Sequence, residues 1–134
     1  MTIPSGTSAP VKPHHSYRHE AFLYRGPDEY VAGLVPFVRD GLTAGQPVMA
    51  ALPGSHLALL RDGLGADADY VELVDMTELG HNPARIIPGW RRFLERSCRG
   101  EQPVRGVGEP IWAGRRAAEL TECQFHEALL NLAV

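Results

Sequence analysis

The residues of this chain with the most distinctive chemistry lie between positions 105 and 131. The first part of this segment, Arg105-Gly-Val-Gly-Glu-Pro-Ile-Trp112, places Glu109 directly after a short strand-like run and Trp112 just beyond it. A tryptophan beside a carboxylate and an arginine is typical of a small binding pocket with an apolar floor and a polar rim. The alternative is structural: Trp112 covers the core, and Glu109 pairs with Arg105 or Arg115.

The second part of the segment is predicted to form a helix over residues 114–132. At about 100° per residue, Arg115, Glu119, Glu122 and His126 fall on one stripe of this helix. Residues four apart on this stripe could pair with each other, as on many solvated helix faces. The flanking residues are apolar, however, and if they pack inward they carry part of the stripe toward the core. A charge buried in this way needs a partner or a ligand. Glu122 and His126 are therefore candidates both for internal pairing and for a binding pocket.

Cys123 and His126 are three residues apart, so their side chains could converge on one point beside this helix. Thiolate and imidazole are ligands of zinc or another soft divalent ion, and His19 or Glu122 could complete the set. The candidate metal ligands are therefore His19, Cys123 and His126, with Glu122 as the alternative to His19. Two alternatives stay open: a buried thiol beside a hydrogen-bonded histidine, and a nucleophilic cysteine with His126 as its base.

The elements that would position these residues alternate between strands and helices. Strands are predicted over residues 19–24, 48–52, 70–74 and 103–108. Between them the apolar residues recur at helical spacing; Asp28 is expected to cap the first helix and Asn82-Pro83 to start a later one. This order predicts an α/β fold with a mostly parallel sheet flanked by helices. Ligands collect at the carboxyl ends of such strands, here near Tyr24 and Glu109.

Length and composition indicate one domain and disfavour several classes of protein. The 134 residues carry a formal net charge of −3, which argues against direct binding to nucleic acid. No apolar run approaches the length of a membrane span, so no membrane partner is expected. Two cysteines fit a reduced, cytoplasmic setting better than a disulfide framework. Residues 1–16 are predicted to be a flexible leader, and residues 17–134 a single domain.

The sequence lacks the phosphate-binding motif of nucleotide-hydrolysing enzymes. No Gly-x-x-x-x-Gly-Lys-Ser/Thr loop follows a predicted strand, and Gly54-Ser55-His56 is a poor substitute for one. Lys12, in the predicted leader, is the only lysine of the chain. No nucleotide is therefore expected as a cofactor.

Several of these motifs together resemble a known family, the MEDS domain, whose name stands for methanogen/methylotroph, DcmR sensory domain. The resemblance covers residues 17–134. It is carried by His19-Glu-Ala-Phe-Leu-Tyr24, Phe37-Val-Arg-Asp-Gly-Leu-Thr-Ala-Gly-Gln-Pro-Val48, Asn82-Pro-Ala-Arg85, Arg105-Gly-Val-Gly-Glu-Pro-Ile-Trp112 and Glu122-Cys-Gln-Phe-His-Glu-Ala-Leu-Leu-Asn131.

The resemblance implies a core similar to RecA/KaiC-type ATPases without a functional phosphate loop, and a role in sensing small, hydrocarbon-derived molecules. It also implies that histidine and cysteine take part in sensing, which here points to His19 and Cys123, with His126 as a further candidate. In actinobacteria the domain resembles the N-terminal half of anti-sigma-factor regulators, in which a histidine-kinase-like ATPase domain follows. A truncated chain and a stand-alone sensor both remain open.

The leading hypothesis is a non-catalytic regulatory domain that senses a small organic molecule. Its partner would be a sigma-factor regulatory protein or a C-terminal ATPase domain. The candidate ligand-binding residues are His19, Tyr24, Arg105, Glu109, Trp112, Glu122, Cys123 and His126. The alternatives are a protein-interaction module without a ligand and a small Cys/His-dependent enzyme.

Overall fold

The described part of the chain forms a three-stranded parallel sheet with helices on both faces. The computed structural model describes residues 18–97, 102–112 and 114–124. Strand β1 (Val48–Leu52) lies between β2 (Glu72–Asp75) and β3 (Arg105–Gly108) in the order β2-β1-β3. Both pairings are parallel, with Ala50 opposite Leu73 in β2 and Val107 in β3. The α/β fold with a parallel sheet is therefore confirmed, and the continuous apolar run 48–52 is its fully buried central strand.

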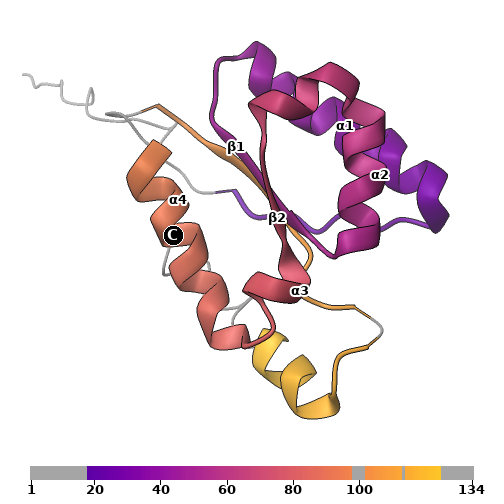
Figure 1. Cartoon of the computed structure of the whole chain (residues 1–134), viewed down its shortest axis with the longest axis vertical. Helices are drawn as coiled ribbons and strands as arrows, with labels where there is room; N and C mark the ends of the chain where they lie inside the picture. Colours follow the sequence, from indigo (N-terminus) through magenta and orange to yellow (C-terminus); the bar gives the residue numbers. More distant parts are fainter. Residues whose placement is uncertain (1–17, 98–101, 113, 125–134) are drawn as a thin grey trace, which may run out of the picture.

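Each face of β1 packs against its own group of helices. Val48, Ala50 and Leu52 face α1 (Gly26–Thr43) and α2 (Gly54–Leu64). The alternate residues Met49 and Ala51 belong to a second core with Met76, Ile86, Phe93 and Cys123. This alternation follows from the two-residue period of a strand, which sends successive side chains to opposite faces. Figure 1 shows α1 and α2 on one side of the sheet and α4 (Ile86–Ser97) on the other.

The remaining helices are short and connect these layers. A 3-10 helix, η3 (Gly65–Tyr70), leads into β2, and α3 (Met76–Leu79) begins directly after the end of β2. A second 3-10 helix, η4 (Pro83–Arg85), precedes α4. Among the described residues, no helix is long and apolar enough to cross a bilayer.

The helix starts agree with the sequence in one case and differ in another. The Asn82 side chain accepts a hydrogen bond from the Ala84 N–H at 3.0 Å, so the predicted start at Asn82-Pro83 is confirmed. The predicted cap at Asp28 is wrong, because α1 already begins at Gly26 and Asp28 lies in its first turn. A carboxylate there still interacts favourably with the positive end of the helix dipole.

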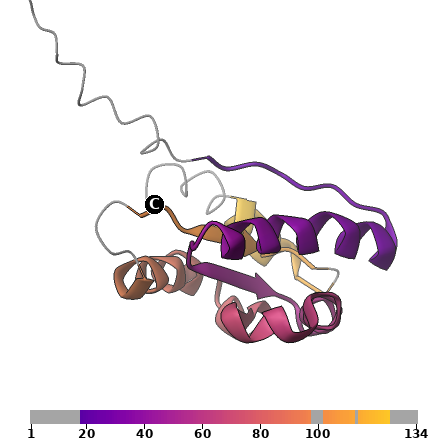
Figure 2. The ribbon, with the colours of Figure 1, turned by 90° about the horizontal axis from the view of Figure 1, so that it is seen from above.

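The predicted strand over residues 19–24 is not part of the sheet. This segment is extended and runs beside α1 (Figure 2). Its aromatic side chains pack on that helix: the Phe22 ring covers Gly33, and the Tyr24 ring lies 4.6 Å from the ring of Tyr30. The apolar pattern that suggested a strand thus serves contact with a helix, and the segment pairs with none of the three described strands.

The last predicted helix is observed only in part. Residues 117–124 are helical, and Arg115 precedes this helix. The rest of the predicted range, with His126, lies outside the described residues. In Figure 1 the helical residues 117–124 lie at the end of the molecule near α3.

Candidate functional site

A cleft opens where β1 and β3 end. Leu52 ends β1 and Gly108 ends β3, so the residues after both strands meet at the carboxyl edge of the sheet. The Glu109 N–H donates to the Ala51 carbonyl at 3.0 Å, which holds Glu109 at this edge. The cleft has a volume of about 600 Å³, within the range of small-molecule sites. Its lining residues are Tyr24, Pro53, Ser55, His56, Glu109, Ile111, Trp112, Arg115 and Leu120.

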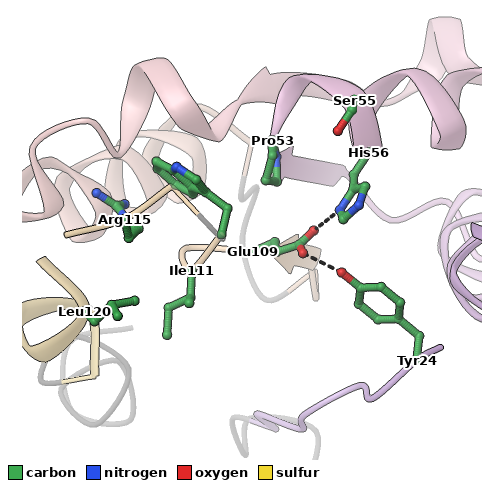
Figure 3. Close-up of a pocket in the computed structure, with 9 residues that line it drawn as sticks. Tyr24, Pro53, Ser55, His56, Glu109, Ile111, Arg115 and Leu120 are labelled. Carbon is green, nitrogen blue, oxygen red and sulfur yellow. Dashed lines mark hydrogen bonds and ion pairs between the residues drawn. The ribbon is translucent and has the colours of Figure 1, made fainter. Parts of the chain in front are cut away.

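The Glu109 carboxylate is the polar centre of this cleft. Tyr24 donates its hydroxyl hydrogen bond to Oε2 at 2.7 Å, and Tyr30 donates to Oε1 at 2.9 Å. His56 Nδ1 lies 2.8 Å from Oε1 (Figure 3). The three partners come from the extended segment, from α1 and from α2. One carboxylate therefore ties three elements to the end of β3.

The two tyrosines are held in their protonated form. Burial, the hydrogen bond to Glu109 and the negative charge of that carboxylate raise the pKa of Tyr24 to about 12. Burial and the charge of Glu109 raise the pKa of Tyr30 further still. Both hydroxyls are therefore donors to Glu109. In its neutral form His56 donates from Nδ1, which leaves Nε2 as a hydrogen-bond acceptor.

The opposite wall of the cleft combines apolar side chains with a buried cation. The guanidinium carbon of Arg115 lies 3.8 Å from the centre of the Trp112 ring, and its Nε donates to the Pro110 carbonyl at 3.0 Å. Nη1 lies 3.8 Å from Glu119 Oε1, beyond hydrogen-bonding distance. Within the described residues Nη1 and Nη2 have no hydrogen-bond partner, and the side chain is fully buried. In Figure 3 the nitrogen atoms of Arg115 point away from Glu109.

The structure brings together three of the predicted site residues: Tyr24, Glu109 and Trp112 all line the cleft. Arg105 lies elsewhere, because it begins β3 at the amino edge of the sheet. There it donates to the Gln46 side chain at 3.1 Å and to the Phe37 carbonyl at 2.9 Å. The interactions of Glu109 described above involve neither Arg105 nor Arg115.

Three further predicted residues, Glu122, Cys123 and His19, are not among the described residues that line the cleft. Glu122 is exposed and borders a second, smaller hollow of about 320 Å³ next to η4. The Cys123 side chain is fully buried, and its Sγ donates to the Pro110 carbonyl at 3.5 Å. His19 is exposed on the extended segment. A thiol with no exposed surface is not placed to attack a substrate.

The predicted metal set of His19, Cys123 and His126 stays a prediction. Within residues 18–97, 102–112 and 114–124, no three His, Cys, Asp or Glu side chains gather in a way that could hold an ion. His126 lies outside these ranges. Cys123 packs in the core with Met49 and Ala51 of β1, whereas His19 belongs to the extended segment before α1.

Sequence reasoning missed His56 and Tyr30, which complete the environment of Glu109. His56 follows the central strand by four residues and sits in the first turn of α2. Its position beyond the carboxyl end of a buried strand was a usable signal. Gly54-Ser55-His56 does not form a phosphate loop, but the same segment supplies the imidazole that contacts Glu109. Tyr30 gave no such signal, since its spacing in α1 is that of a core residue.

The family described as the MEthanogen/methylotroph, DcmR Sensory domain, MEDS, matches residues 18–134 of this chain. The match includes every described element and all residues of the cleft. No curated protein and no solved structure shows significant similarity to the chain.

Proposed function

The chain belongs to the MEDS family of sensory domains, and from this premise we propose that it senses a small organic molecule in the cleft around Glu109. The observation that supports this most is the arrangement of Tyr24, Tyr30 and His56 around one carboxylate. Polar groups that converge in a partly apolar cleft at the end of parallel strands are the usual features of a ligand site.

The role proposed for the cleft is binding and signalling without catalysis. Its polar groups come from the segment before α1, from α1, from α2 and from the end of β3, so a ligand there would contact several elements at once. A ligand that fits only one arrangement of these elements would shift the domain toward that arrangement. This is the physical requirement for a sensor.

The proposed receiver of the signal is a sigma-factor regulatory protein or an ATPase domain that follows the MEDS domain. The supporting observation is the position of Arg115. Its side chain lines the cleft, and its Nη1 lies 3.8 Å from Glu119 Oε1, a residue that borders the second hollow. A ligand that displaces Trp112 would also move Arg115, and this movement would change the surface around Glu119. Pull-down of the partner with and without ligand tests this step.

A ligand screen on the whole chain tests the proposed site. The screen contains cationic, neutral and anionic organic molecules, and binding is followed by the melting temperature. A molecule present at 100 times its Kd is expected to add about 2.7 kcal/mol to the free energy of unfolding. The effect should disappear in Ile111→Trp, because the larger ring would fill the mouth of the cleft, where Ile111 is 39% exposed.

Phe37→Trp is the matched control, since Phe37 has the same exposure of 39% and lies beside Arg105 at the other edge of the sheet. It should leave ligand binding unchanged. A screen without any stabilising molecule would argue against the proposed function. So would a stabilising molecule that binds equally well to Ile111→Trp.

A further inference from the structure

Apart from the Ser55 hydroxyl, which can donate or accept, the side-chain groups around Glu109 that are still open to a ligand are hydrogen-bond acceptors. A carboxylate accepts about four hydrogen bonds. Glu109 Oε1 already interacts with Tyr30 and His56, whereas Oε2 accepts only from Tyr24 among the described interactions. The Tyr24 hydroxyl donates its proton to Glu109 and keeps its lone pairs, and the neutral form of His56 keeps the lone pair of Nε2. This end of the cleft therefore offers acceptors around one negative charge.

The start of α2, which would ordinarily attract an anion, already faces carboxylates of the chain itself. Glu109 contacts the His56 imidazole in the first turn of α2. A Cβ atom on Gly54 would lie 3.3 Å from Asp75 Oδ2, so a second carboxylate approaches the same turn. The negative charges of Glu109 and Asp75 already interact with the positive end of the α2 dipole. An anionic ligand would meet repulsion there.

The other end of the cleft suits an apolar group. Ile111 and Leu120 line it, and the Trp112 ring carries the Arg115 guanidinium on one face. The two terminal nitrogens of Arg115 are buried, so they offer no hydrogen bond to a ligand in this arrangement. Their positive charge nevertheless repels a cation close to Trp112. A cationic ligand would therefore place its charge beside Glu109 and its apolar part toward Ile111 and Leu120.

From these contacts we propose that the ligand of the cleft is a small amine that binds in its ammonium form and carries a short apolar group. The inference rests on the proposed function, namely that this cleft holds a small organic molecule. The ammonium group donates to Glu109 Oε2 and to the Tyr24 hydroxyl oxygen. The raised pKa of Tyr24 supports this assignment, because a protonated phenol leaves its oxygen free to accept.

Three probes of nearly equal size and different charge test the inference on the whole chain: 2-phenylethylammonium, 2-phenylethanol and 3-phenylpropanoate. Binding is measured by NMR titration at pH 7.5. We expect the ammonium ion to bind at least about tenfold more tightly than the alcohol, since hydrogen bonds to a charged partner are the stronger ones. The carboxylate probe should bind more weakly than both.

Glu109→Gln should weaken binding of the ammonium probe by about tenfold or more and change binding of the alcohol by less than about threefold. Glu72→Gln is the matched control: this carboxylate pairs with Arg96 outside the cleft, and its removal should leave all three probes unaffected. The comparison of the probes on the unaltered chain decides the question even where a variant does not fold.

The outcomes separate this inference from the proposed function. Tighter binding of the alcohol or the carboxylate in the cleft overturns the amine assignment and leaves the sensing site in place. Ammonium binding that survives Glu109→Gln also overturns it. If none of the three probes binds, the amine assignment falls, and the broader screen with Ile111→Trp decides separately whether the cleft binds any organic molecule.

Discussion

Replacement of Tyr30 by phenylalanine probes the hydrogen bonds of Glu109 most directly. The change removes one hydroxyl group, whose oxygen lies 2.9 Å from Glu109 Oε1 on a residue that is 2% exposed. Water cannot replace this donor, and a hydrogen bond to a charged acceptor contributes about 1.5–3 kcal/mol. We expect the free energy of unfolding to fall by that amount, and the melting temperature by about 5–10 °C.

Tyr24→Phe is the matched comparison, because Tyr24 donates to the same carboxylate from a partly exposed position. Water can take its place, so the loss should be only about 0.5–1 kcal/mol. Urea unfolding followed by circular dichroism gives both values. In a Glu109→Gln background the cost of Tyr30→Phe should fall by about half, since its bond is no longer charge-assisted.

Two results would refute this reasoning. One is a Tyr30→Phe variant that loses no more stability than Tyr24→Phe. The other is an equal cost of Tyr30→Phe in the native and the Glu109→Gln backgrounds. Either would mean that Tyr30 contributes through packing of its ring and that its hydroxyl bond to Glu109 has little weight.

Three further changes test other parts of the structure. Gly106→Ala places a Cβ 2.7 Å from the Trp90 ring and should lower the free energy of unfolding by about 1–3 kcal/mol in urea titrations, whereas Gly114→Ala, with an ordinary contact of 3.5 Å, should change it little. The pKa of Tyr24 rises from 10.0 to about 12 on folding, so its contribution to stability is complete below pH 10 and is lost as the pH rises toward 12. The urea midpoints of the native chain and of Tyr24→Phe should therefore converge over that interval, and a constant gap would contradict this cause. Arg115→Met keeps most of the packing and removes a buried charge whose terminal nitrogens have no hydrogen-bond partner among the described residues. Calorimetry should therefore show a melting temperature that is unchanged or higher. A fall of more than about 2 kcal/mol in the free energy of unfolding would show that the charge is compensated.

The sequence predicts the fold well because its signals are local. The run 48–52 is apolar throughout and becomes the central strand, and Asn82-Pro83 starts a helix as expected. The extended segment before α1 is the exception. A short apolar run has the same composition whether it pairs with a strand or lies on a helix, so its pattern alone could not decide.

The site was harder to predict because its contacts join distant parts of the chain. The end of β3 pointed to Glu109 and Trp112, which both line the cleft, whereas Arg105 is only four residues away from Glu109 and lies at the opposite edge of the sheet. A strand extends about 3.3 Å per residue, so residues at its opposite ends do not share a site. His56 reaches Glu109 only because β1 and β3 are adjacent, and no local pattern reveals that pairing.

The order of the strands also has a consequence for the way the domain folds. Met49 pairs with Glu72 across a single helical crossover, whereas Val48 pairs with Arg105 much farther along the chain. Closing the longer loop costs more entropy, so we expect β1, α2 and β2 to associate first and β3 to dock last. Glu109 follows β3, and its bonds to Tyr24 and Tyr30 then form only at the end of folding. Substitutions in the cleft should accordingly accelerate unfolding and leave the folding rate nearly unchanged. A bound ligand should act in the same late step, by slowing the loss of β3 from the sheet.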